Sequence, residues 1–191
     1  DRINEYHQEQ NLSRPIRIIE LWCGDGRSLS YIDKRVQHPV EYTGIDFAQW
    51  FIDLAQQYHP RQKFVRMDML SYVQSLNQGS IDIVLGIASL QHIPTKTQRL
   101  SLWQHIYRVL QRQWLFMHCN RRKSQRFKNK YKQQLLHAKL KNLLTLWTRN
   151  PNDLLIPYNT QSWKRLRFYH IFTQYELHIL ASLSWLPITY L

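Results

Sequence analysis

The feature that most constrains the fold of this chain is a glycine turn between a strand-like run and a helix-like run. Residues Glu20–Arg27 read Glu-Leu-Trp-Cys-Gly-Asp-Gly-Arg and follow the apolar run Ile16–Ile19. Glycine lacks a Cβ, so the backbone of such a turn can approach a ligand closely, and the helix start that follows offers unpaired N–H groups. A strand, a glycine turn and a helix in this order predict a nucleotide-binding turn.

A second acidic residue supports a nucleotide site. Asp46 ends the strand-like run Glu41–Asp46 and lies 20 residues after Gly26. At the end of a second strand, a carboxylate accepts hydrogen bonds from the hydroxyls of a ribose. Dinucleotide folds and S-adenosylmethionine folds share this layout, so these residues alone leave both classes of cofactor open.

Strand-length apolar runs alternate with helix-like stretches along most of the chain. The strand-like runs are Arg17–Leu21, Glu41–Asp46, Lys63–Met67, Ile81–Ile87 and Trp114–His118. The helix-like stretches are roughly Arg27–Arg35, Ala48–Tyr58 and Thr95–Leu110. This alternation predicts an α/β fold, a Rossmann-like three-layer sandwich with a mostly parallel sheet and helices on both faces.

The length and composition of the chain indicate one domain. A chain of 191 residues, 43% of them hydrophobic, can bury one sizeable core. We therefore expect residues 1–191 to form a single domain, with a basic helical insertion at about residues 121–150. Thr173 and Glu176 have the spacing of a capping box, which predicts a last helix over Thr173–Leu183.

The sequence lacks the patterns of a membrane or metal protein. No stretch approaches the roughly 20 apolar residues that a transmembrane helix needs, and no signal-peptide pattern opens the chain. We therefore expect a cytoplasmic protein with no membrane partner. Cys23 and Cys119 lack the spacing of metal ligands or of a disulfide framework, so we expect no metal and two reduced cysteines.

Four segments in order resemble a class I S-adenosylmethionine-dependent methyltransferase. The glycine turn resembles the first motif of that superfamily, Asp/Glu-x-Gly-x-Gly-x-Gly, with Trp22 in place of the first glycine, and Asp46 resembles the acid after strand two. Phe64–Met69 resembles the segment whose acid meets the adenine, whereas Ile81–Gly86 and Ala88–Ile93 resemble strand four and the substrate-facing loop. The resemblance implies S-adenosyl-L-methionine as the cofactor. The residues that it places at the cofactor are Glu20, Gly24, Gly26, Asp46, Asp68, Met69, Ala88 and His92.

The second half of the chain narrows this resemblance. Asp153–Tyr158, Arg165–Phe172 and the Glu-Leu pair at Glu176 resemble the tRNA wobble-uridine carboxymethyl methyltransferase family. In that family a Val/Ile-Pro-Trp element precedes an Arg-Tyr-Tyr-His-x-Phe element and a helix containing Glu-Leu. Tyr158 stands here in place of the usual Trp, and Phe168 stands where the family often has Tyr.

This narrower resemblance implies esterification of a carboxymethyl group on the wobble uridine of a tRNA. A carboxylate is already nucleophilic at neutral pH, so the site mainly has to align it with the methyl group and the sulfur. Arg167 is the candidate cation, because a guanidinium can bind a carboxylate in a bidentate manner. Tyr169 and His170 are its candidate catalytic neighbours, although a packing role for the first and a structural role for the second stay open. The resemblance implies tRNA as a partner and admits a small activating protein subunit.

The positive charge of the chain lies in its second half. Residues 1–82 have a net charge of −2 and residues 83–191 a net charge of +15, and no acidic residue occurs between Asp82 and Asp153. A solvated helix face usually mixes charges of both signs, whereas a surface that neutralises phosphates gains affinity by releasing counterions. The sequence therefore predicts an RNA-binding surface. Its candidate residues are Arg121, Arg122, Lys123, Arg126, Lys128 and Lys130.

Tryptophan is unusually frequent relative to glycine, with 7 residues against 5. Trp22, Trp50, Trp114 and Trp185 stand where related methyltransferases commonly carry glycine or a small residue. One hypothesis is that some of these tryptophans are glycines in the cell. The same codon would then be translated as tryptophan in one genetic code and as glycine in another. The other hypothesis is a diverged, catalytically inactive relative.

Three functions stay open at this point. They are methyl transfer to tRNA, methyl transfer to a carboxyl or hydroxyl group of a small molecule, and an inactive RNA-binding or partner-binding module. The chain begins at Asp1 without an initiator methionine and, after a strand expected at Leu186–Leu191, stops one strand short of related folds. We therefore expect a fragment or a product processed at both ends.

Overall fold

The computed structural model describes residues 2–119, 129–144, 150, 152–159 and 164–184. The chain divides into two compact units. The first comprises Asp1–Ser89 and Gln104–His118, and the second comprises Leu90–Trp103 and Cys119–Leu191. A single domain with a basic insertion stays a prediction.

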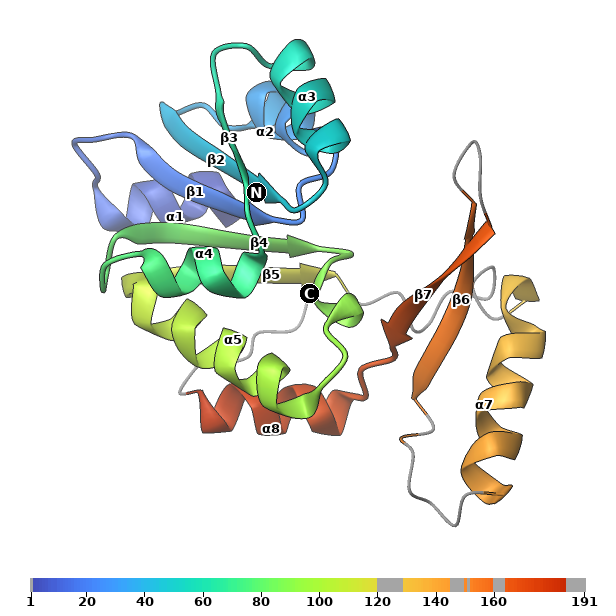
Figure 1. Ribbon diagram of the computed structural model, residues 1–191. Coiled ribbons are helices and arrows are strands. Elements are labelled where there is room, and N and C mark those ends of the chain that lie inside the picture. The colour runs from blue at the N-terminus through green and yellow to red at the C-terminus, as the bar shows by residue number, and fades with distance from the viewer. Residues whose placement is uncertain (1, 120–128, 145–149, 151, 160–163, 185–191) are drawn as a thin grey trace. The chain divides into compact units, whose positions relative to one another are not determined.

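The first unit is built on a five-stranded sheet in the order β3-β2-β1-β4-β5, flanked by helices (Figure 1). Its strands are β1 (Ile16–Leu21), β2 (Val40–Asp46), β3 (Lys63–Arg66), β4 (Ile81–Ile87) and β5 (Leu110–Cys119). β1 pairs in parallel with both β2 and β4, and β2 pairs in parallel with β3. The strand order changes direction at β1, because β2 and β3 lie on one side of it and β4 lies on the other. At such a point α/β folds bind ligands outside the carboxyl ends of the strands. The predicted Rossmann-like fold class is confirmed.

Strand β1 lies at the centre of this sheet because its sequence suits burial on both faces. Ile16, Ile18, Ile19 and Leu21 are each at most 1% exposed, as expected for the near-continuous apolar run of a central parallel strand. The helices of this unit are α1 (Arg2–Gln10), α2 (Leu29–Arg35), α3 (Gln49–Tyr58) and α4 (Met69–Ser75). The core cluster around β1 also contains Ile3, Leu29, Ile32, Tyr42, Ile83 and Leu85.

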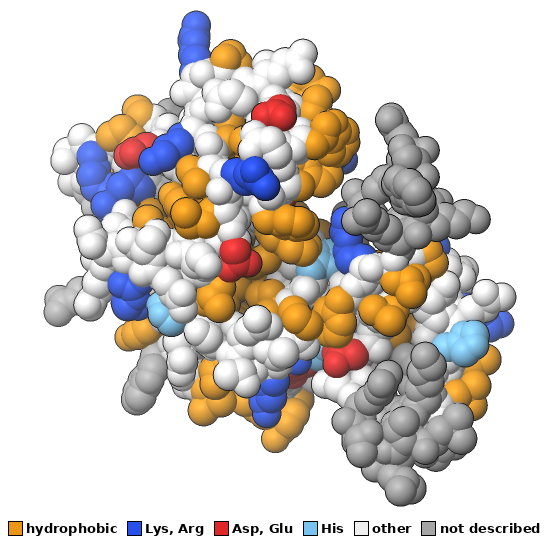
Figure 2. All heavy atoms as spheres, viewed as in Figure 1, with side chains coloured by type: hydrophobic (Ala, Val, Ile, Leu, Met, Phe, Trp, Pro, Cys, Tyr) orange, Lys and Arg blue, Asp and Glu red, His pale blue; other side chains and the backbone are white. Residues whose placement is uncertain are grey.

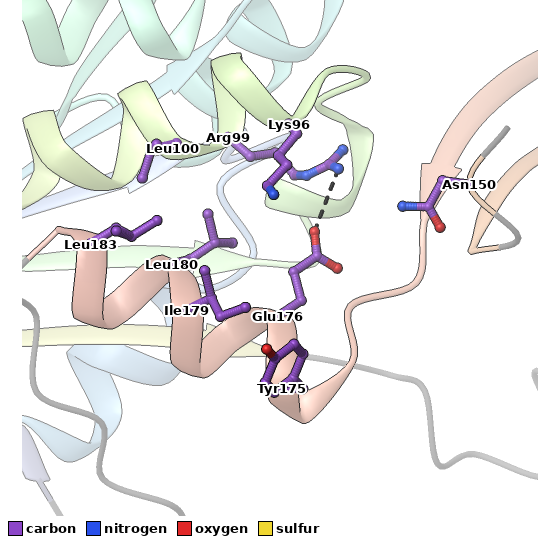
Figure 3. Close-up of a pocket in the computed structure, with 9 residues that line it drawn as sticks. All are labelled: Lys96, Arg99, Leu100, Asn150, Tyr175, Glu176, Ile179, Leu180 and Leu183. Atoms are coloured by element: carbon purple, nitrogen blue, oxygen red, sulfur yellow. Dashed lines mark ion pairs between the residues drawn. The ribbon is translucent and has the colours of Figure 1, made fainter. Parts of the chain in front are cut away.

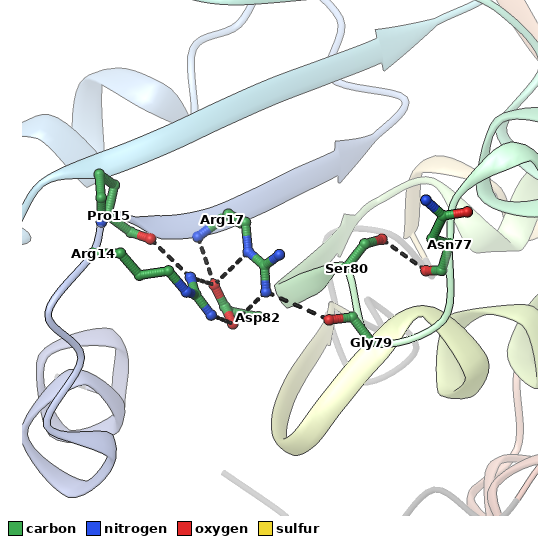
Figure 4. A network of polar contacts seen from close by, with 7 residues as sticks. All are labelled: Arg14, Pro15, Arg17, Asn77, Gly79, Ser80 and Asp82. Atoms are coloured by element: carbon green, nitrogen blue, oxygen red, sulfur yellow. Dashed lines mark hydrogen bonds and ion pairs between the residues drawn. The ribbon is translucent and has the colours of Figure 1, made fainter.

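An ion-pair network fixes the amino ends of β1 and β4 (Figure 4). The side chain of Asp82 is fully buried and accepts hydrogen bonds from Arg14 at 2.6 and 2.8 Å. It also accepts bonds from the backbone N–H of Arg17 at 2.8 Å and from its guanidinium at 3.2 and 3.3 Å. Burial alone would raise the pKa of Asp82, but these bonds outweigh it and lower the pKa to about 2. The network therefore holds the sheet at the end opposite to the glycine turn.

The second unit contains an antiparallel hairpin of β6 (Asp153–Asn159) and β7 (Lys164–His170) together with helices α7 (Lys132–Leu144) and α8 (Gln174–Leu183). It also contains the short helix η1 (Leu90–His92) and the first turns of α5 (Lys96–Val109). One face of the hairpin forms an apolar cluster with α7. The cluster comprises Leu154, Ile156, Tyr169 and Ile171, with Tyr131 and Leu135 packed against it.

Most of the predicted elements are present, with shifted ends. α5 ends at Val109 and β5 begins at Leu110, four residues earlier than the sequence predicted. The predicted last helix is α8, and Thr173 caps it by accepting a hydrogen bond from the backbone N–H of Glu176. Helices α1 and α4 and the strand character of β6 and β7 were not predicted from the sequence. The strand predicted at Leu186–Leu191 lies outside the described residues.

Among the helices of the described residues, none combines the length and the apolar character that crossing a bilayer requires. Groups of three or more His, Cys, Asp or Glu side chains arranged to hold a metal ion are also absent from the part of the chain that the structure describes. The cytoplasmic location stays a prediction.

Candidate active site

The turn after β1 contains three residues in the left-handed backbone region. Trp22, Gly24 and Gly26 have φ angles of 59°, 59° and 75°. A Cβ added to Gly24 would meet no atom within 4 Å, so the turn leaves open space above its backbone. A Cβ on Gly26 would lie 3.1 Å from the ring of His59, so packing here is tight, and the φ angle of 75° favours glycine.

Asp46 lies beside this turn at the end of β2. Its side chain is buried, and its Oδ2 atom accepts a hydrogen bond of 3.1 Å from the backbone N–H of Gly24. Its Oδ1 atom accepts a bond of 2.9 Å from the backbone N–H of Ala48. The structure therefore brings together the glycine turn and the acid that the sequence predicted for the ribose.

Glu20 lies beneath the turn. Only 2% of this residue is exposed, and its two oxygens accept hydrogen bonds from Ser28 at 2.7 Å and from Tyr42 at 2.6 Å. Burial raises the pKa of Glu20, and the two hydroxyl donors oppose that shift. These contacts tie β1 to β2 and to the start of α2, which orients the turn; a direct contact with the cofactor stays a prediction.

The sequence reasoning did not single out Gly44, which the turn also requires. A Cβ at this position in β2 would lie 2.7 Å from Phe64 Cδ1 and 2.8 Å from Cys23 Sγ. Cys23 belongs to the turn, and its backbone N–H donates a hydrogen bond to the carbonyl of Ile45. A glycine within a strand often marks such a close approach, and that signal was available in the sequence.

Two further predicted cofactor residues follow β3. Asp68 is exposed and caps α4, because its Oδ1 atom accepts a hydrogen bond of 3.0 Å from the backbone N–H of Ser71. Met69 is 3% exposed and belongs to the core. The backbone N–H of Met67 donates to the carbonyl of Asp46, so the segments after β2 and β3 run side by side.

The segment after β4 carries backbone strain. Ala88 has a φ angle of 54°, which a residue with a Cβ rarely adopts. Ser89 follows and is fully buried; among the described residues its hydroxyl has no hydrogen-bond partner. Strained backbone and unsatisfied buried polar groups concentrate at functional sites, which agrees with the predicted position of Ala88 at the cofactor edge of the sheet.

In the second unit, His92 contacts the candidate substrate-binding cation. His92 Nδ1 lies 2.8 Å from the carbonyl oxygen of Phe168, and its Nε2 lies 3.3 Å from Nη1 of Arg167. Burial lowers the pKa of His92 to about 4; the carbonyl of Phe168 opposes this shift and the charge of Arg167 adds to it. The ring is therefore neutral at pH 7, with its proton on Nδ1, and Nε2 accepts a hydrogen bond from the guanidinium. The ring of Tyr169 stands edge-on to His92 at 5.5 Å between centroids.

His170 occupies a different place from Arg167, although it lies on the same strand. It is fully buried, with Nδ1 at 2.6 Å from Asp153 and Nε2 at 2.6 Å from Glu176. Burial alone would lower the pKa of His170, but the two carboxylates outweigh it and raise the pKa. The imidazolium thus joins β6, β7 and α8, which gives His170 a structural role. A catalytic role stays a prediction.

Glu176 extends this network to α5. Its second oxygen lies 3.5 Å from Nη2 of Arg99, and Figure 3 shows these two side chains pointing toward one another among the residues that line a pocket between α5 and α8. Nη1 of Arg99 donates to the carbonyls of Ile93 and Pro94 at 2.9 and 3.2 Å. The network therefore also holds the segment that follows His92.

The predicted RNA-binding residues are mostly outside the described part of the chain. Arg121, Arg122, Lys123, Arg126 and Lys128 lie in the segment that the structure leaves out. Lys130 is exposed, and its Nζ atom lies 5.3 Å from the centre of the Tyr131 ring. Trp185 also lies outside the described residues.

Comparison with known proteins identifies the family. The model of the family described as Methyltransferase domain matches residues 18–113, which contain the glycine turn, Asp46, Asp68 and the segment after β4. The chain belongs to this family. The match places it among S-adenosylmethionine-dependent methyltransferases, and the predicted class I resemblance is confirmed.

Relatives and solved structures agree with this family. A phthiotriol/phenolphthiotriol dimycocerosates methyltransferase of Mycobacterium leprae is 37% identical over 97 residues, which cover 48% of this chain and 34% of that protein. A trans-aconitate 2-methyltransferase of Delftia acidovorans is 28% identical over 82 residues, which cover 43% of this chain and 30% of that protein. The chain thus matches about a third of the length of these curated relatives. A SAM-dependent methyltransferase structure from Methanosarcina mazei has a TM-score of 0.65 at 21% identity, covering 92% of this chain and 81% of that one.

Proposed function

We propose that this methyltransferase transfers the methyl group of S-adenosylmethionine to a carboxylate of a small organic acid. The observation that carries the proposal is the hydrogen bond between Arg167 and a neutral His92. A guanidinium oriented in this way suits a carboxylate, which it can bind through two parallel N–H donors. The name of one relative supports the same substrate class, because trans-aconitate is a carboxylic acid.

The residues of the first unit fit the cofactor. The open space over Gly24 allows a ligand to lie against the backbone, and the buried carboxylate of Asp46 is in place to accept hydrogen bonds from ribose hydroxyls. Asp68 follows β3 and Ala88 follows β4, so both lie at the carboxyl edge of the parallel sheet. When bound, S-adenosylmethionine supplies an electrophilic methyl group on a positively charged sulfur. The indole of Trp22 is the one side chain of the turn that departs from this fit.

The acceptor requires little chemistry from the protein beyond orientation. As a carboxylate oxygen forms its bond to the methyl carbon, the bond from that carbon to sulfur breaks, and the negative charge of the acceptor is neutralised. No proton has to leave, so no general base is needed. Arg167 is the residue that would bind the carboxylate of the acceptor, and His92 holds Arg167. His92 stays uncharged and so adds no positive charge beside the guanidinium.

Substitution of Arg167 tests this proposal. With a panel of small carboxylic acids, Arg167→Gln should raise the KM for the acid at least about tenfold, because a charge-assisted hydrogen bond contributes roughly 1.5–3 kcal/mol. Affinity for S-adenosylhomocysteine should not change. Lys96→Gln removes an exposed cation from the same unit and serves as the control. An unchanged KM in Arg167→Gln would contradict the carboxylate role of Arg167.

A second candidate is methyl transfer to tRNA, and the charge distribution favours it. Residues 83–191 carry a net charge of +15, and the narrower resemblance to wobble-uridine enzymes lies in the same half. The relatives compared above are named for small-molecule or lipid acceptors. If tRNA is the acceptor, replacing Arg121, Arg122 and Lys123 by Glu should abolish salt-sensitive tRNA binding. An activating protein subunit stays a prediction.

A further inference from the structure

We infer that helix α7 is a docking surface for an anionic lipid bilayer. The inference goes beyond the proposed function and does not depend on it, because vesicle binding is measured without turnover. It revises the expectation of no membrane partner, which considered only transmembrane helices and signal peptides. It rests on exposed leucines on α7 and on exposed lysines beside them. It also rests on the ion pairs of Asp153 and Glu176, the two acidic residues of the segment 83–191.

The leucines of α7 divide between two directions. Leu135 is partly buried and packs against the apolar cluster of the hairpin. Leu136 is 58% exposed and Leu140 is 47% exposed. Residues four apart lie on the same face of a helix, so these two leucines form one apolar stripe turned away from that cluster. Burial of such a stripe is favourable wherever an apolar phase is available.

Positive charges accompany this stripe. Lys132 is exposed and lies four residues before Leu136, which places it on the same face. Lys130, two residues before Lys132, is also exposed. In Figure 2, hydrophobic, Lys/Arg and His side chains lie together at the surface over α7. A helix that combines an apolar stripe with lysines is typical of segments that lie in the interface of an anionic membrane.

The carboxylates of this half of the chain do not offset the positive charge at α7. After Asp82 the sequence has only two acidic residues, Asp153 and Glu176. Both are within 2.6 Å of the buried His170, and Glu176 also pairs with Arg99. Their charges are therefore balanced locally by an imidazolium and a guanidinium, and Lys130 and Lys132 keep their attraction for a surface of phosphates.

The combination of exposed leucines and exposed lysines at α7 favours a bilayer over RNA as the binding partner. RNA-binding surfaces use cations for the backbone and aromatic or guanidinium planes for the bases, and an aliphatic stripe adds nothing to either contact. A bilayer interface interacts favourably with both kinds of side chain, because the anionic headgroups attract the lysines and the acyl region buries the leucines.

Vesicle co-sedimentation tests the inference. The whole chain should bind vesicles of phosphatidylcholine and phosphatidylglycerol at least about tenfold more strongly than vesicles of phosphatidylcholine alone. The double variant Leu136→Ser, Leu140→Ser should lower the partition coefficient for the anionic vesicles at least about tenfold. The matched control is Leu155→Ser with Leu166→Ser, which removes two leucines of 55% and 65% exposure from the hairpin and should retain binding.

The variants are first compared with the parent by far-UV circular dichroism, so that unfolding is not mistaken for lost binding. Equal vesicle binding by the α7 double variant and the parent would overturn the inference. So would salt-sensitive binding of the parent to bulk tRNA without binding to anionic vesicles.

Discussion

Replacing Trp22 by glycine should improve cofactor binding at a measurable cost in stability. Trp22 has a φ angle of 59°, in the same turn as Gly24 and Gly26, and its ring lies 5.5 Å from the ring of Phe47 between centroids. A residue with a Cβ is disfavoured in this backbone region because the Cβ approaches the following carbonyl oxygen. The indole also occupies the edge of the sheet at which the cofactor is expected to bind.

The effect on stability follows from three contributions. Glycine at position 22 relieves roughly 1–2 kcal/mol of left-handed backbone strain. Loss of the partly buried indole and its contact with Phe47 costs up to about 3–5 kcal/mol, and the greater freedom of glycine in the unfolded chain costs about 0.4–1 kcal/mol more. The losses outweigh the relief of strain, so urea denaturation of Trp22→Gly should give a free energy of unfolding about 1–4 kcal/mol below the parent value.

Cofactor affinity should change much more. Calorimetric titration with S-adenosylhomocysteine should give at least about tenfold tighter binding to Trp22→Gly than to the parent, equivalent to about 1.4 kcal/mol. Trp22→Ala is the matched control, because it removes the indole but leaves a Cβ on the strained backbone. It should recover binding only in part. Equal affinity of parent and Trp22→Gly for S-adenosylhomocysteine would refute this reasoning.

Three further predictions concern the cofactor acid, the buried histidine and the tryptophan codons. Asp46→Asn places an amide opposite the backbone N–H of Gly24 and should weaken binding of S-adenosylhomocysteine at least about tenfold by calorimetry; unchanged affinity would exclude the ribose role. The pKa of His170 is raised above 6.5, so its contribution to stability is fully present below pH 6.5 and is lost as the pH rises through the folded value. His170→Gln should therefore flatten the fall in urea stability as the pH rises above 6.5, and an equally steep fall in the variant would contradict this. If some tryptophan codons are read as glycine, the intact mass of the protein from its source organism should be lower than the mass calculated for seven tryptophans, and agreement with that mass would end the hypothesis.

The sequence was most informative where one local pattern implied one geometry. The run before Glu20 and the turn at Gly24 and Gly26 specified a strand, a ligand-facing loop and a helix, and Asp46 lies beside that loop as expected. The spacing of Thr173 and Glu176 located the start of α8, because a cap is a contact between neighbours in the chain.

The sequence was least informative where a residue's role depends on partners distant in the chain. His170 and Arg167 belong to one motif, yet the first is closed in by Asp153 and Glu176 and the second contacts His92. Alternation along β7 turns these two side chains to opposite faces, and only the hairpin register decides which face is buried. Gly44 illustrates the same limit, because a glycine is needed there only on account of the nearby side chains of Cys23 and Phe64.

The central claim is that the chain makes a methyl ester on a carboxylate, and the product of labelled methyl transfer tests it most directly. Incubation with methyl-labelled S-adenosylmethionine and a panel of small carboxylic acids should give a labelled product that releases labelled methanol under mild base. Trp22→Gly should form more of this product, and Arg167→Gln should form little. A labelled product that resists mild base, or label found in added tRNA but in none of the acids, would contradict the proposed reaction.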